Sequence, residues 1–244
     1  SIDRVRRVGR ERLDRASDLA APRYPRVRPS APLSDAYLLT NARDEPQLAH
    51  ELRAELDTAD GVDLLCAFIQ WRGIRVLEAE LARLRERGAP LRVITTTYVG
   101  ATERLAIDRL VRDFGAEVKV QYDIMRTRLH AKAWMFGRGS GLNTAYVGSS
   151  NLSRSALVDG LEWNVRLSAV STPLLLDKFR ATFDSYWDDP TFETYDPDRD
   201  GDKLDDALAE ASGRVHRDRA TVSLSGLQVR PYPHQSEMLD ALRS

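Results

Sequence analysis

The sequence predicts a layered α/β/α domain with a mixed, largely parallel sheet and helical extensions at both ends. Three short apolar runs alternate with amphipathic segments, which is the pattern of parallel strands joined by right-handed helical crossovers. Two more apolar runs follow and extend this sheet. At 244 residues, with 42% hydrophobic and 30% charged residues, the chain has the composition of a soluble globular protein with a sizeable core.

Composition shifts divide the chain into four segments. They are a basic helix with a proline-rich arm (1–44), the α/β domain (45–192), an acidic linker with a helix (193–226) and a short C-terminal segment (227–244). The basic helix indicates a solvated helix face or a flexible arm, with a partner-binding arm as the alternative. The net charge of −1 excludes a protein that coats nucleic acid by bulk charge, so any phosphate-binding surface is local.

Helix and strand signals mark the elements of the α/β domain in chain order. The signals are proline near a helix start, glycine at a helix end and continuous apolar runs. They predict helices over 45–56, 74–88, 102–114 and 173–187, strands over 62–69, 90–96 and 118–122, and a helix over 203–211 in the acidic segment. Cys66, the only cysteine, falls inside the first strand, so we expect a buried and unreactive thiol.

Two strand segments carry polar side chains that a structural strand does not need. In residues 129–136, alternation places His130 and Lys132 on one face, so an imidazole and an ammonium lie side by side. A glycine-rich reversal leads to the run 144–147, which ends in Gly148-Ser149-Ser150-Asn151. A hydroxyl and a carboxamide therefore arrive at a strand end, where a rigid sheet can position them.

A third strand candidate, residues 161–167, also alternates. Its apolar residues take one face and leave Glu162, Asn164 and Arg166 on the other. Beside the other two strands, Glu162 would orient and polarise His130, as a carboxylate behind a histidine does in nucleophilic sites. The candidate catalytic set is then suited to holding a phosphate and attacking it: His130, Lys132, Ser149, Asn151 and Glu162.

These residues resemble the signature of the phospholipase D superfamily, H-x-K followed by G-S-x-N. The chain has His130-Ala131-Lys132 and Gly148-Ser149-Ser150-Asn151. The aspartate of the common form is missing, because Gly137 stands at its place, and this absence resembles the H-x-K…N variant of tyrosyl-DNA phosphodiesterases and some nucleases. The resemblance implies a phospholipase D-like fold and argues against a lipase.

The resemblance also implies a mechanism. In the superfamily one histidine attacks phosphorus to form a phosphohistidine and a second protonates the leaving oxygen, roles that suit imidazole near neutral pH. Here His130 would be the nucleophile. Lys132 and Asn151 would hold non-bridging oxygens, and Ser149 would donate a further hydrogen bond. Cleavage then requires no metal ion and no other cofactor. Because the chain has one motif and the mechanism uses two histidines, we expect a two-fold homodimer that pairs His130 of both subunits.

Further residues are candidates for binding the substrate strand. Arg72 and Tyr98 follow predicted strands, where open α/β sheets place ligands, although a surface ion pair is an equally good interpretation of Arg72. The basic residues Arg126 and Arg128 precede the H-x-K motif, and Asn164 shares the polar face of the third strand. With one cysteine and four histidines, we expect no metal site.

The last residues of the chain resemble another family. The aromatic-Pro-x-Gln pattern Tyr232-Pro233-His234-Gln235, followed by a helical segment, is similar to the opening of the motor domain in DEAD/DEAH-type superfamily 2 helicases. In that family the glutamine reads adenine, which implies that Gln235 contacts nucleotide in a full-length protein. Ser244 comes before any G-x-x-x-x-G-K-[ST] loop, so we expect the N-terminal part of a larger helicase. ATP and Mg²⁺ would serve only the absent motor. A chance match in so short a stretch is the alternative.

The sequence therefore predicts a metal-independent phosphodiesterase, a nuclease domain that cleaves nucleic acid, DNA more than RNA, and is coupled to a C-terminal ATP-dependent helicase. Two alternatives stay open: a catalytically silent module for nucleic-acid binding and dimerisation, and an end-processing enzyme like a tyrosyl-DNA phosphodiesterase. No apolar run approaches the roughly 18 residues of a membrane span and no signal peptide opens the chain, so we expect a cytoplasmic protein without a membrane partner.

Overall fold

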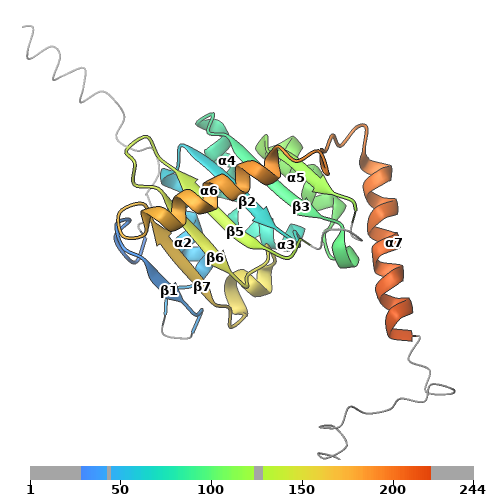
Figure 1. Cartoon of the computed structure of the whole chain (residues 1–244), viewed down its shortest axis with the longest axis horizontal. Coiled ribbons are helices and arrows are strands. Elements are labelled where there is room, and N and C mark those ends of the chain that lie inside the picture. Colours follow the sequence, from blue (N-terminus) through green and yellow to red (C-terminus); the bar gives the residue numbers. More distant parts are fainter. Residues whose placement is uncertain (1–28, 43–44, 124–128, 221–244) are drawn as a thin grey trace, which may run out of the picture.

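The computed structural model describes residues 29–42, 45–123 and 129–220, with side chains up to residue 213 (Figure 1). Most of the predicted basic arm lies outside the described residues, as do Arg126, Arg128 and the helicase-like segment with Gln235. Within the described ranges, one sheet organises the chain.

In this part of the chain, eight strands form a mixed sheet between two layers of helices. The strands lie in the spatial order β1-β7-β6-β5-β2-β3-β4-β8. Their bounds are β1 (Tyr37–Leu39), β2 (Gly61–Cys66), β3 (Leu91–Thr96), β4 (Glu117–Gln121), β5 (Lys132–Gly137), β6 (Thr144–Gly148), β7 (Asn164–Ser168) and β8 (Phe192–Thr194). Strand β1 precedes the predicted domain limit of residue 45 and β8 crosses that of residue 192, so the sheet extends further than the sequence indicated.

Helices cover both faces of the sheet. Helices α2, α4 and α5 pack on one face, α6 crosses the other, and α7 lies to one side against the turn η2 (Figure 1). The helices are α2 (Leu48–Thr58), α3 (Trp71–Ile74), α4 (Glu78–Glu86), α5 (Arg104–Phe114), α6 (Pro173–Trp187) and α7 (Gly201–Ala220), with the short turns η1 (Arg75–Leu77), η2 (Tyr98–Gly100) and η3 (Ser155–Asp159). The predicted layered α/β class is thereby confirmed.

The direction of the strands differs from the prediction. Strands β2, β3 and β4 pair in parallel, which confirms the three predicted strand–helix units. The other pairs in the described sheet are antiparallel, including β2 with β5, β5 with β6 and β6 with β7. The expectation of a largely parallel sheet is therefore wrong for the half that carries the motif. The glycine-rich turn between β5 and β6 reverses the chain within a few residues, whereas parallel strands need a long crossover.

The central strand β2 is buried on both faces, as its continuous apolar run predicted. Leu64 packs in the core under α2, and Leu65 packs in the core under α6. Cys66 at the end of the strand is buried, and burial raises the pKa of its thiol to about 11. The thiol therefore stays protonated near neutral pH, as an unreactive core residue does.

A buried carboxylate joins helix α2 to the strands that carry the motif. Glu55 accepts hydrogen bonds from Thr144 Oγ1 at 2.8 Å and from the Tyr146 hydroxyl at 3.0 Å, both on β6. Arg138, which follows β5, donates to the same carboxylate, and Arg166 Nε on β7 lies 3.3 Å from it. Both guanidinium groups are buried. Strands β5, β6 and β7 are thus tied to one point on α2.

Replacing Glu55 with alanine should destabilise the fold. The change leaves the guanidinium groups of Arg138 and Arg166 buried without a counter-charge, and breaking a buried pair of this kind costs about 3–5 kcal/mol. The measurement is the free energy of unfolding in urea. Glu86→Ala, at an exposed glutamate on α4, is the control and should change this free energy by less than about 0.5 kcal/mol. A loss in Glu55→Ala no larger than in the control would contradict the role assigned to Glu55.

Candidate active site

His130 lies at the surface where β5 begins, next to the exit of β2. Lys132, two residues further, stands opposite Cys66 in the antiparallel β2–β5 register. The imidazole of His130 is exposed and meets the ring of Phe68 edge-on, with 5.6 Å between the ring centroids. The pairing of β2 with β5 therefore sets where the imidazole stands.

The side chain of Lys132 turns back to His130. Its ammonium donates to the His130 carbonyl at 2.8 Å and lies 3.0 Å from Nδ1 and 3.2 Å from Nε2 of the same residue. Lys132 is only 8% exposed, and burial lowers the pKa of its ammonium. A partly desolvated cation therefore contacts an exposed imidazole. Such a cation attracts an anion more strongly than one in bulk water, because the effective dielectric constant is lower.

The segment after β6 brings Asn151 to the same end of the sheet. Leu152 N donates to Phe68 O at 3.2 Å, and Gln70 N donates to Leu152 O at 2.9 Å. Because Phe68 also contacts His130, these bonds place both motifs at the exit of β2. The Oδ1 atom of Asn151 is buried and has no hydrogen-bond partner in the described part of the chain. The carboxamide of Asn151 therefore keeps one hydrogen-bonding group that no described residue uses, at the same end of the sheet as the exposed imidazole.

Two glycines allow these segments to approach closely. A Cβ atom on Gly148 would lie 2.2 Å from Trp163 O and 2.4 Å from Asn164 Oδ1. A Cβ atom on Gly73 would lie 2.2 Å from Leu152 O. No side chain fits at either place, so the glycine of the G-S-x-N motif is a packing requirement. Sequence reasoning does not identify Gly73, because its contact lies far along the chain.

The structure places Glu162 beside Ser149 instead of His130. Ser149 Oγ donates to the Glu162 carboxylate and accepts a hydrogen bond from Trp163 N at 3.1 Å. Among the described residues, no hydrogen bond links Glu162 to His130. The expected histidine–carboxylate pair is therefore wrong. Glu162 precedes β7, which begins at Asn164, so it lies in a connection and not on a strand face. Its carboxylate also engages the Ser149 hydroxyl that was expected to donate to a phosphate.

Strand β7 has the inverse of its predicted faces. The expected polar face is buried, because Asn164 is 3% exposed and Arg166 is fully buried against Glu55. Asn164 Nδ2 donates to Ser150 Oγ at 2.8 Å, so this residue supports the turn after β6 and does not face a substrate. The register accounts for the inversion, since Arg166 pairs with Tyr146, whose side chain also reaches Glu55.

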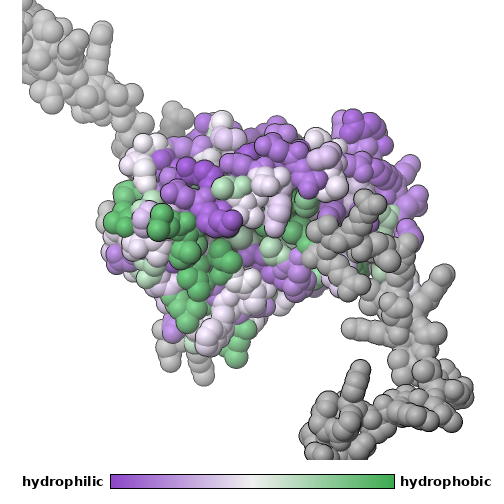
Figure 2. Space-filling view, viewed as in Figure 1, coloured by the Kyte–Doolittle hydropathy of each residue, from purple (hydrophilic) through white to green (hydrophobic). Residues whose placement is uncertain are grey.

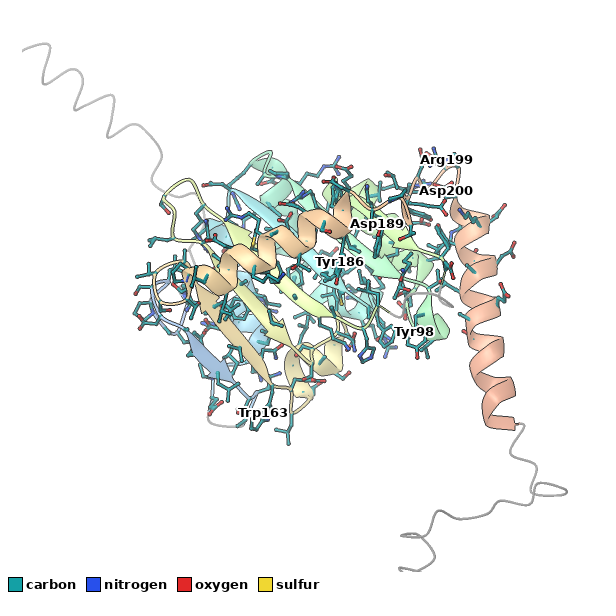
Figure 3. All side chains as sticks on the ribbon, in the orientation of Figure 1. Tyr98, Trp163, Tyr186, Asp189, Arg199 and Asp200 are labelled. Carbon is teal, nitrogen blue, oxygen red and sulfur yellow. The ribbon has the colours of Figure 1, made fainter. Side chains whose placement is uncertain are left out.

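The apolar side of β7 lies uncovered next to the site. Leu38, Val165 and Val147 stand opposite one another across β1, β7 and β6 and are 45%, 43% and 41% exposed. Trp163, whose carbonyl accepts a hydrogen bond from Ser149 N, is 64% exposed (Figure 3). We refer to Leu38, Val147, Trp163 and Val165 as the apolar surface. Figure 2 shows apolar side chains gathered over this end of the sheet, beside α6.

The other two described candidates, Arg72 and Tyr98, lie near strand ends as predicted. Arg72 is exposed on α3 and, within the described residues, makes no ion pair or hydrogen bond, so the ion-pair interpretation has no support. Tyr98 is half-buried in η2, and its backbone N donates to Thr96 Oγ1 at 3.1 Å. Figure 3 shows it well separated from Trp163 along the edge of the domain.

Neither a metal-ligand cluster nor a membrane-spanning helix occurs in the described part of the chain. No three His, Cys, Asp or Glu side chains there are grouped closely enough to hold a metal ion. None of the helices there combines the length and the apolar character needed to cross a bilayer.

The sequence matches a known family over the region that contains this site. A family model described as "Cardiolipin synthase, PLD-like domain" matches residues 52–187, which is more than half of the chain and includes both motifs. The chain belongs to the phospholipase D-like family. The family resemblance predicted from the two motifs is thereby confirmed, and the site lies within the phospholipase D-like domain. A search of curated proteins gave no match.

Solved structures share the fold of this phospholipase D-like domain. The phospholipase D family member Nuc from Salmonella typhimurium superposes with a TM-score of 0.50 at 16% identity, covering 66% of this chain and 99% of that chain. Phosphatidylserine synthase from Haemophilus influenzae superposes with a TM-score of 0.51 at 12% identity, covering 77% of this chain and 46% of that chain. At these identities the likeness shows the fold alone.

Replacing Gly148 with alanine should distort the site. The added Cβ atom would overlap the Trp163 carbonyl, so β7 or the turn after β6 must move, at a cost of about 1–3 kcal/mol. Gly137→Ala is the matched control, because Gly137 also ends a strand and its added Cβ atom meets only Gly61 O at 3.6 Å. Melting curves followed by circular dichroism give the comparison. Equal melting temperatures for the two variants would contradict the overlap of the added Cβ atom with the Trp163 carbonyl.

Proposed function

We propose that this phospholipase D-like domain is a phosphodiesterase that cleaves nucleic acid, DNA more than RNA, with His130 as its nucleophile. The observation that carries the proposal is the contact between the exposed imidazole of His130 and the partly desolvated ammonium of Lys132, 3.0 Å from Nδ1. A nucleophile and a cation at this separation can act on one phosphate group. Membership of the phospholipase D-like family supports this class of reaction.

The reaction would proceed in two steps at one phosphorus atom. A neutral ring nitrogen of His130 attacks the phosphorus, the P–O bond to the leaving group breaks, and the leaving oxygen takes a proton from a second imidazole. A water molecule then gives a proton to that imidazole and attacks the phosphohistidine, and the P–N bond breaks to release a phosphate monoester. Lys132 and Asn151 would hold the non-bridging oxygens in both steps, without a metal ion.

A second copy of the chain would supply the second imidazole. The apolar surface lies beside Ser149, and a two-fold interface over it would remove Val147, Trp163 and Val165 from water. Such an interface would join the two copies next to the site. The uncovered apolar surface therefore supports the homodimer that the single H-x-K motif predicts.

The proposed coupling to a helicase rests on the C-terminal pattern that ends in Gln235. A motor that moves along DNA would deliver the strand to the site. Delivery of this kind suits a chain with a net charge of −1, which attracts little nucleic acid by bulk charge. ATP and Mg²⁺ would serve the motor and have no part in cleavage.

Replacing His130 with alanine should abolish cleavage and preserve the fold. Wild-type protein should cut plasmid and single-stranded DNA in the presence of EDTA, and His130→Ala should be slower by about a thousandfold or more, because it lacks the nucleophile. His50→Ala, at an exposed histidine on α2, is the control and should cut like wild type. Full cleavage by His130→Ala would remove the catalytic assignment, and DNA binding without cleavage by the wild type would favour a silent binding module.

The same assay separates the remaining alternatives. Dimers that mix wild-type and His130→Ala subunits should lose most of their activity, because each reaction needs both imidazoles. Half of the wild-type activity would instead indicate two independent sites. If the protein releases tyrosine from 3′-tyrosyl DNA and leaves internal phosphodiester bonds intact, it is an end-processing enzyme.

At alkaline pH, the activity should decline at a lower pH than it would if Lys132 were an exposed lysine. Burial lowers the pKa of Lys132, so its ammonium loses the proton, and with it the charge that holds the phosphate, before an exposed lysine does. Lys132→Arg should move this alkaline limb upward, because a guanidinium keeps its charge. The measurement is kcat/KM between about pH 7 and 11. If the alkaline limb lies at the same pH in both proteins, the titration of another group causes it.

A further inference from the structure

Three arginines line an open pocket on the surface of the domain. The pocket has a volume of about 440 Å³ and is lined by Arg72, Arg75, Val76 and Arg154. No described carboxylate lines it, so three positive charges face one space. We refer to Arg72, Arg75 and Arg154 as the arginine pocket.

The guanidinium groups of the arginine pocket have no counter-charge within the described residues, where none of them makes an ion pair or hydrogen bond. Several other arginines of the domain are paired. Arg83 lies 2.8 Å from Asp57, and Arg92 lies 2.7 Å from Asp63. Because like charges repel, an anion from outside the chain would relieve the repulsion within the arginine pocket.

Backbone packing fixes the arginine pocket relative to the His130 site. Gly73, inside helix α3, packs directly on the carbonyl of Leu152, and Asn151 precedes that residue. Leu152 N in turn donates to the carbonyl of Phe68, whose ring contacts His130. One short segment therefore contacts both the helix of the arginine pocket and the residue that supports the imidazole, so both are held to the same part of the backbone.

We propose that the arginine pocket binds a phosphate of the substrate strand that flanks the phosphate held at His130. The inference rests on the proposed function and adds a second contact with the same strand. A single strand carries one negative charge per nucleotide, so the neighbours of the reacting phosphate must be accommodated nearby. Guanidinium groups present forks of N–H donors that match phosphate oxygens. The pocket then sets the path of the strand and favours substrates with more than one phosphate.

Binding of a fluorescein-labelled single-stranded oligonucleotide tests the pocket directly. All proteins carry His130→Ala, so that the bound strand is not cut, and Kd is measured by fluorescence anisotropy at several salt concentrations. Adding Arg72→Ala and Arg154→Ala should raise Kd about tenfold or more, since hydrogen bonds to charged groups are lost. The slope of log Kd against log salt should fall by about 0.7 for each phosphate contact removed.

Arg180→Ala is the matched control for this measurement. Arg180 is also exposed and unpaired within the described residues, but it lies on α6 in a different pocket, together with Asp63 and Asp184. It should leave Kd and the salt slope unchanged. If the arginine-pocket variant behaves like Arg180→Ala, or if no oligonucleotide binds to the parent protein, the proposal is overturned.

A small diester separates a failure of the pocket from a failure of the proposed reaction. Bis(p-nitrophenyl) phosphate has one phosphate and cannot reach a flanking site. With His130 intact, the Arg72→Ala and Arg154→Ala protein should hydrolyse it like wild type and should lose about tenfold or more in kcat/KM on the oligonucleotide. Equal losses on both substrates would overturn the flanking site. A wild type that cuts neither the small diester nor the oligonucleotide would overturn the reaction, while the binding measurement would still test the pocket.

Anionic lipid is the competing ligand, and vesicles test it. Wild type and the arginine-pocket variant are sedimented with phosphatidylcholine vesicles that contain phosphatidylglycerol. The proposal expects no difference between the two proteins. If the variant loses vesicle binding and keeps oligonucleotide binding, the arginine pocket serves a membrane surface and the proposal is overturned.

Discussion

The buried carboxylate of Glu55 is the contact on which the motif-bearing half of the sheet depends. Glu55 lies on α2. Its carboxylate accepts hydrogen bonds from two hydroxyls of β6 and contacts two guanidinium groups, one just after β5 and one on β7. A buried charge is tolerated only when it is paired and hydrogen-bonded, so these strands are held in one register relative to α2. Burial of Arg166 then turns the polar side of β7 inward, which places Asn164 under the turn that carries Ser149 and Asn151.

At the other end of the same strands, the site is assembled by backbone contacts. Gly148 lets β7 lie against the end of β6, and Gly73 lets α3 lie against the segment with Asn151. His130 and Lys132 come to this place because β5 pairs antiparallel with β2. The reactive groups therefore sit at strand ends and in the short connections next to them, anchored to a rigid sheet. The proposed cleavage site and the arginine pocket are both anchored to the sheet by these backbone contacts. A substrate strand bound at one would therefore be aligned at the other.

The two errors in the expected site have one origin. Alternation in residues 161–167 separates two faces of a strand but does not say which face is buried, and apolar residues usually decide that question. In β7 the ion pair of Arg166 with Glu55 outweighs the burial of Val165, so the apolar side is left exposed beside the site. The same alternation predicts Glu162 on the strand. It lies in the connection before β7 and meets Ser149, because the strand begins later than the pattern suggested.

The amino-acid pattern alone was sufficient for the class of fold, the strand–helix units, the burial of Cys66 and the family, because periodicity, glycine and proline signals and the two motifs are all local. The folded chain was needed for the antiparallel direction of the motif strands, the buried side of β7, the partner of Glu162 and the grouping of Arg72 and Arg75 with Arg154. These features arise from contacts between residues far apart in the chain. Such contacts depend on which charges and backbones meet when the elements pack, and local periodicity carries no information about that.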